Sequence, residues 1–93
     1  MDIKDALICV QAKQYRLAAN YLVKEGLRDK IDGLTEKQRD KLTTLAARTL
    51  RKNHQQALEL NKGDSTPQEI AKEAYEDTVF ELELDKDFWI SLP

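Results

Sequence analysis

Apolar residues recur every three or four positions along the first 25 residues, which is the repeat of an α-helix. They form two rows: Ile3, Leu7, Val10, Leu17 and Tyr21 in one, and Ile8, Tyr15, Ala18 and Leu22 in the other. Asp2 can cap the start of such a helix, and Gly26 can end it in a Schellman turn that folds Leu27 back on Leu22. The pattern predicts one helix over residues 3–25 that is apolar around most of its circumference.

A second helical repeat opens with a capping-box pattern, in which Thr35 is followed by Gln38. Its apolar side then contains Leu42, Ala46, Leu50, Ala57 and Leu60. The pattern predicts a helix over residues 36–61, which would be about 39 Å long at 1.5 Å per residue and thus long for so small a chain. We therefore expect any break in this helix at Asn53 and His54.

The strongest local signal is Thr66-Pro67-Gln68-Glu69, which combines a capping threonine, a proline at the first helical position and a glutamate at the third. This signal predicts the start of a third helix. The apolar residues that follow share one face: Ile70, Ala71, Ala74, Tyr75 and Val79. The predicted helix covers residues 67–79.

From Phe80 the apolar period changes to two, because Phe80, Leu82 and Leu84 alternate with glutamates. Such alternation is typical of a β-strand. Residues 80–93 are therefore expected to form an extended tail, which includes a short β-hairpin around residues 85–87 as one alternative. If the helix continued instead, Phe80 and Leu84 would lie on its acidic face.

Together these patterns predict an all-α fold, a three-helix bundle-like domain over residues 1–93 with an extended apolar C-terminal tail. The chain has 93 residues, of which 41% are hydrophobic and 34% are charged. A chain of this length buries only about 60–65% of the surface that its unfolded form exposes, so its core is marginal. Because the first helix is apolar around most of its circumference, we expect a second copy to cover it in a homodimer.

Charge is distributed unevenly along the chain. Residues 1–62 carry thirteen Lys and Arg against eight Asp and Glu, a net charge of +5. Residues 63–93 carry two against nine, a net charge of −7. This asymmetry indicates docking of opposite charges, either within the chain or between chains.

The basic residues of the second predicted helix gather opposite its apolar side: Lys37, Lys41, Arg48, Arg51 and Lys52. Two interpretations are open: this basic face is a solvated outer surface, or it lies along the phosphates of a nucleic acid. The pI of about 5.4 favours the first, because dedicated nucleic-acid-binding domains are usually basic overall.

The third predicted helix has an acidic face that consists of Glu69, Glu73, Glu76 and Asp77. A face of this kind either supports solubility or imitates phosphates and docks on a basic groove of a nucleic-acid-handling protein. The second interpretation agrees with the net negative charge of residues 63–93.

The tail that follows is too apolar for a solvated terminus, since it contains Phe80, Leu82, Leu84, Phe88, Trp89 and Ile90. Chain termini are usually frayed unless packing holds them in place. These six side chains either fold back over the core or bind a partner, as an added strand or an aromatic anchor.

Few residues are suited to catalysis or metal binding. His54 is the only histidine and Cys9 is the only cysteine, which excludes an internal disulfide and a Cys-based metal centre. No Gly-rich phosphate loop, His-x-x-x-His pair or nucleophile elbow occurs. We therefore expect no enzyme activity, no cofactor and no metal.

These observations favour a small protein that binds another macromolecule. The single cysteine and the lack of a signal or membrane-spanning segment lead us to expect a cytoplasmic protein that does not enter a membrane. We expect an accessory regulator or inhibitor of a protein partner. The alternative is a nucleic-acid-binding helical module that uses the basic face of the second helix.

Overall fold

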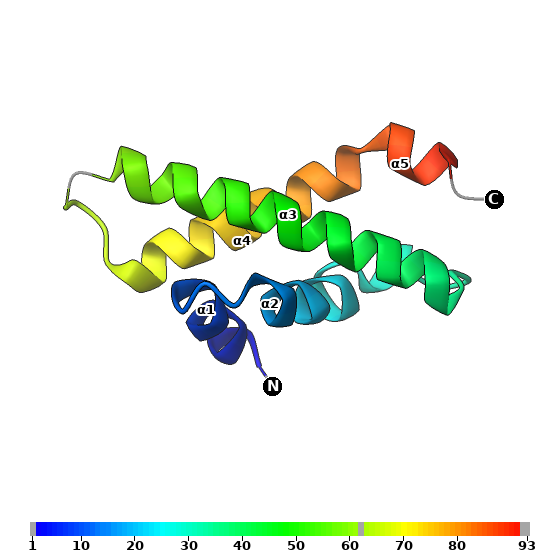
Figure 1. Ribbon diagram of the computed structural model, residues 1–93, viewed down its shortest axis with the longest axis horizontal. Helices are drawn as coiled ribbons and strands as arrows, with labels where there is room; N and C mark the ends of the chain where they lie inside the picture. Colours follow the sequence, from blue (N-terminus) through cyan, green and yellow to red (C-terminus); the bar gives the residue numbers. More distant parts are fainter. Residues whose placement is uncertain (1, 62, 92–93) are drawn as a thin grey trace.

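Helices account for every regular element in the computed structural model, which describes residues 2–61 and 63–91 (Figure 1). No strand occurs in these residues, so the predicted all-α class is confirmed. The radius of gyration is 13.1 Å, close to the roughly 12 Å expected for a compact chain of this length. None of the helices in the described residues is long and apolar enough to cross a membrane.

The N-terminal region folds as two short helices, α1 (Ile3–Gln11) and α2 (Tyr15–Tyr21), so the prediction of one helix over residues 3–25 is wrong. Lys13 has a φ of +62°, a left-handed conformation that turns the chain between them. This turn directs Val10 of α1 and Ala18 of α2 to the same core. Parts of two apolar rows that would need covering from opposite sides on a straight helix are thereby buried in one core.

A π-helical turn, η1 (Leu22–Gly26), continues α2, and a single 3₁₀ turn, η2 (Arg28–Lys30), follows it. The predicted Schellman turn is wrong, because Gly26 is not among the residues with positive φ. Gly26 instead allows close packing on the fourth α-helix. A Cβ at this position would lie 3.0 Å from Cγ2 of Val79 and 3.3 Å from the hydroxyl oxygen of Tyr75.

Helix α3 (Glu36–Leu60) begins with the predicted capping box, in which Thr35 and Gln38 bond to each other's backbone N–H groups. The helix is continuous, so the break expected at Asn53 and His54 is wrong. Both side chains are buried and hydrogen-bonded. They cross-link helices within the core, which explains why two residues of modest helix propensity do not interrupt α3.

Helix α4 (Pro67–Leu84) also begins with its predicted capping box, between Thr66 and Glu69. It continues five residues beyond the predicted end at Val79, and α5 (Lys86–Ser91) follows after Asp85. The extended tail and the hairpin are therefore wrong for residues 80–91, and residues 92–93 lie outside the described part of the chain. Helix α4 continues past Val79 because Leu82 faces the core one turn after the buried Thr78.

Figure 1 shows α3 and α4 running side by side in opposite directions, with α1 and α2 packed along them. The core between these helices is formed mainly by Leu7, Val10, Leu22, Leu42, Ala46, Leu50, Ala71, Ala74 and Leu82. Helix α5 lies at the far end of α4, where Phe88 and Trp89 pack on the edge of this core. The bundle thus leaves the outer faces of α3 and α4 open.

Candidate interaction surfaces

The outer side of α4 combines two large apolar side chains with carboxylates. Phe80 and Leu84 are one helical turn apart and are 62% and 58% exposed. The acidic residues on the same side are Glu73, Glu76 and Asp77, all exposed. We name these five residues the α4 outer face. Phe80 and Leu84 lie on the acidic face, as expected for a helix that continues past Val79.

The carboxylates of the α4 outer face are nearly free of partners. Among the described residues, only Glu76 of this face has an ion pair, with Lys72, at 3.9 Å between two exposed side chains. Glu69, the fourth acidic residue singled out in the sequence, has a different role. Its carboxylate accepts the backbone N–H of Thr66 in the capping box, and this hydrogen bond lowers the pKa of Glu69.

The structure divides the six apolar residues of the predicted partner-binding tail. Leu82 is only 2% exposed and belongs to the core, so it is not available to a partner. Phe88 and Trp89 are half-buried, with their rings edge-to-face at 5.3 Å. Phe80, Leu84 and Ile90 are exposed. The tail therefore closes one end of the core and still presents three apolar side chains to solvent.

The predicted basic face of α3 is exposed along its whole length: Lys37, Lys41, Arg48, Arg51 and Lys52. In the described part of the chain, none of these five side chains forms an ion pair with the acidic residues of α4. The ion pairs found there join Arg16 to Asp40, Arg28 to Glu25 and Lys72 to Glu76. The opposite charges of the two halves thus do not dock on each other within one chain.

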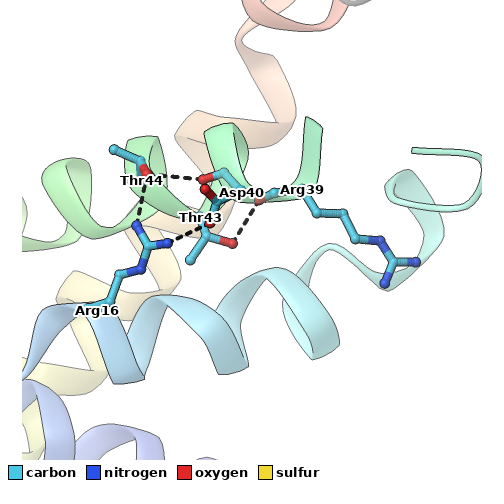
Figure 2. Close-up of polar contacts among 5 residues, drawn as sticks. All are labelled: Arg16, Arg39, Asp40, Thr43 and Thr44. Atoms are coloured by element: carbon cyan, nitrogen blue, oxygen red, sulfur yellow. Dashed lines mark hydrogen bonds and ion pairs between the residues drawn. The ribbon is translucent and has the colours of Figure 1, made fainter. Parts of the chain in front are cut away.

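Arg16 connects α2 to α3, as Figure 2 shows. Its guanidinium donates to the hydroxyl of Thr44 and to the carboxylate of Asp40, each at 2.8 Å. Arg39 is labelled in the same view, and its side chain points away from Arg16. Because both Arg16 and Asp40 are exposed, the ion pair contributes only about 0.2–1 kcal/mol. It fixes the direction of the Arg16 side chain.

A shallow groove of about 590 Å³ lies beside Arg16. Its lining comes from two segments that are distant in sequence: Lys13, Gln14, Tyr15, Arg16 and Leu17 at the α1–α2 turn, and Ala47, Arg48 and Arg51 on α3. We name it the α2–α3 groove. The sequence indicated Arg48 and Arg51, but their proximity to Lys13 and Arg16 had no local signal, because it depends on the turn at Lys13.

A buried hydrogen bond lies next to this groove. The hydroxyl of Tyr15 is 2.8 Å from Nδ1 of His54, and His54 is only 2% exposed. Burial lowers the pKa of His54, and the charge of Lys13 lowers it further. Burial raises the pKa of Tyr15, and the charge of Arg51 opposes that rise. A substrate has little access to such a histidine, and the pair acts as a cross-link between α2 and α3.

Cross-links of this kind also join α3 to α4. The amide of Asn53 donates to the hydroxyl of Thr78 at 3.0 Å, and that hydroxyl donates to the carbonyl of Ala74 at 2.6 Å.

Within the described residues, no buried side-chain nitrogen or oxygen is without a partner, and no cluster of three or more His, Cys, Asp or Glu has a geometry suited to a metal ion. Cys9 is partly buried on α1.

The apolar surface of α1 and α2 bears on the predicted homodimer. The turn at Lys13 buries much of the circumference on which this prediction rested, and the large apolar side chains that stay exposed there are Ile3, Ile8 and Leu17. The homodimer stays a prediction, now resting on a smaller apolar surface.

Comparisons of the chain with protein-family models, with curated proteins and with solved structures found no match. No family assignment therefore supplies a function for the surfaces described above. Two of these surfaces differ most from an ordinary solvated surface. The α4 outer face exposes large apolar side chains, and the α2–α3 groove gathers cationic ones.

Proposed function

We propose that this chain acts by binding a protein partner through the α4 outer face, as a small non-enzymatic accessory regulator or inhibitor. The observation that supports this function is the exposed pair Phe80 and Leu84, set one turn apart among exposed carboxylates. Glu73, Asp77, Phe80 and Leu84 follow one another at intervals of four, three and four residues, which forms one continuous line along a helix.

A line of this composition suits a partner with an apolar groove bordered by lysine and arginine. Helices dock in such grooves through apolar side chains at i, i+3 or i+4 spacing. Burying Phe80 and Leu84 would contribute about 1.5–3 kcal/mol each from apolar surface. The carboxylates would chiefly increase the association rate and select against acidic partners.

The test replaces both apolar residues without disturbing the helix. The variant Phe80→Gln/Leu84→Gln keeps good helix formers and removes the apolar surface. We expect it to fold with an unchanged helical content and to lose a partner that the wild-type chain captures from an extract of its own cells. Binding measured with the purified partner should be at least about 100-fold weaker, which corresponds to the burial of two side chains.

Ile8→Gln is the matched control, because Ile8 is 59% exposed on α1 and lies outside the α4 outer face. We expect this variant to capture the partner as the wild type does. If the double variant and the control retain the same proteins, the α4 outer face is not the binding surface. Increasing the salt concentration should slow association with the partner, since the carboxylates attract its basic residues.

The second candidate function is a nucleic-acid-binding module that uses the basic face of α3. It is favoured by one observation: Lys37, Lys41, Arg48, Arg51 and Lys52 are all exposed on a 25-residue helix and form no ion pair with the described residues. The acidic residues of α4 and the pI of about 5.4 oppose it.

We expect duplex DNA to bind weakly or not at all, because the chain has a net charge of −2 and its acidic half repels phosphates. A fluorescence anisotropy titration at low salt measures this directly. Tight binding that weakens steeply with salt, and that is lost in Lys41→Glu/Arg48→Glu/Lys52→Glu, would make nucleic-acid binding the better interpretation.

A further inference from the structure

We propose that the α2–α3 groove binds a small molecule that carries a diphosphate group. Four of the side chains that line it are cationic: Lys13, Arg16, Arg48 and Arg51. No carboxylate is among its lining residues. Its volume of about 590 Å³ falls within the range of small-molecule sites, roughly 300–1,000 Å³.

The backbone brings the residues that carry these cations to one groove. Lys13 keeps a left-handed conformation, which is uncommon for a residue with a Cβ, and the N–H of Gln14 closes the turn on the carbonyl of Cys9 at 2.8 Å. Arg48 and Arg51 are three residues apart on α3 and so share one side of that helix. The two segments therefore place positive charge around the same groove.

Most of this charge has no partner in the protein. Arg16 is held by Asp40 and Thr44, but the side chains of Lys13, Arg48 and Arg51 form no hydrogen bond or ion pair with the described residues. Their charge also acts on the neighbouring Tyr15–His54 hydrogen bond. Lys13 lowers the pKa of His54, and Arg51 opposes the rise in the pKa of Tyr15 that burial causes. A bound diphosphate group would relieve the mutual repulsion of these cations and accept charge-assisted hydrogen bonds from them.

A hollow at the start of α3 provides an internal comparison. It is lined by Lys37 and Arg39 but also by Glu36 and Asp40, so its positive and negative charges balance. The α2–α3 groove differs because its positive charge is not balanced. Arginine is suited to phosphate oxygens because its planar guanidinium can donate two parallel hydrogen bonds. Tyr15 and Leu17 also line the groove and offer apolar surface to an organic group attached to the phosphates.

The test is a titration of the full chain, followed by ¹H–¹⁵N NMR at constant ionic strength, with inorganic pyrophosphate and separately with adenosine diphosphate. We expect saturable shifts at residues 13–17 and 47–51 for both ligands. If adenosine diphosphate binds more tightly than pyrophosphate, the groove also recognises an organic group attached to the phosphates. If the two affinities are equal, the groove recognises the diphosphate alone.

Two variants of equal charge change separate a defined site from general attraction. Arg48→Gln/Arg51→Gln should bind pyrophosphate at least about tenfold more weakly, since it removes two charge-assisted donors. Lys37→Gln/Lys41→Gln should bind as the wild type does. Unsaturated shifts at millimolar ligand, or equal weakening in both variants, would overturn the proposal, as would tight duplex DNA binding without any pyrophosphate site.

This proposal is independent of the proposed function, because the α2–α3 groove shares no residue with the α4 outer face. Arg48→Gln/Arg51→Gln should leave capture of the protein partner unchanged, and Phe80→Gln/Leu84→Gln should leave pyrophosphate binding unchanged. Failure of one proposal is therefore distinguishable from failure of the other.

Discussion

Replacing Trp89 with alanine should lower the free energy of unfolding by about 2–4 kcal/mol. The indole is half-buried against the core and donates from Nε1 to the carbonyl of Leu82 at 2.7 Å, where α4 ends. Its ring also packs edge-to-face on Phe88. The substitution removes the apolar contact and one of the hydrogen bonds that satisfy the last turn of α4. Urea unfolding followed by circular dichroism measures this loss.

Ile90→Ala is the control, since Ile90 is on the same short helix and 79% exposed. It should change the free energy of unfolding by no more than about 0.5 kcal/mol. If Trp89→Ala were as mild as this control, the packing of α5 on the core would contribute nothing to stability. If only Trp89→Ala loses stability, the aromatic end of the tail has a structural role. Phe80 and Leu84 are then the apolar residues of the tail that are available to a partner.

The starts of α3 and α4 were predictable because their signals are local. The capping boxes at Thr35 and Thr66 each involve a residue and the third one after it, and both form as expected. The bend at Lys13 had no such signal. No glycine or proline occurs at the α1–α2 turn, and its left-handed conformation is stabilised by the burial of two helices against α3 and α4.

The C-terminal tail was mispredicted because alternation over five residues fits two structures. In a strand, Phe80, Leu82 and Leu84 would all share one face. In the helix that forms, Leu82 enters the core, whereas Phe80 and Leu84 lie outside. Continuation of the helix was favoured by long-range contacts that the local pattern does not contain, above all the packing of Leu82 and the hydrogen bond from Trp89.

The two candidate surfaces differ in how far the sequence could predict them. The α4 outer face lies on one continuous helix, so its composition follows from spacing once the helix is known to reach Leu84. The α2–α3 groove joins Lys13 and Arg16 to residues more than 30 positions away. Only the tertiary structure brings those charges together, and it also places Arg48 and Arg51 of the basic face of α3 beside Tyr15.

The second large effect that we expect is a loss of stability on acidification, caused by His54. This side chain is buried, and burial and the charge of Lys13 both lower its pKa from the usual 6.5. The Tyr15 hydroxyl stays protonated, because burial raises its pKa, and it can donate to Nδ1 of a neutral His54 whose proton is on Nε2. Protonated His54 would lose this acceptor and would place a buried charge beside Lys13 and Arg51.

The direction of the effect follows from proton counting. Below about pH 6.5 the unfolded chain binds a proton at His54 that the folded chain does not, so the free energy of unfolding falls as the pH falls. The slope is at most about 1.4 kcal/mol per pH unit, and it ends once the pH passes below the pKa of the folded state. Above pH 7 this contribution is fully present. Urea unfolding at half-unit steps from pH 8 to pH 5 measures the slope.

His54→Gln is the control, because a glutamine amide can still accept from Tyr15 but does not titrate. Its stability should be nearly independent of pH between 7 and 5, even if its overall stability is lower. Glu69 does not interfere, since its pKa is lowered from 4.5 and lies below this range. A wild-type chain that loses no more stability than His54→Gln over this interval, or whose His54 titrates at 6.5 or above by NMR, would contradict the assignment of a buried neutral imidazole.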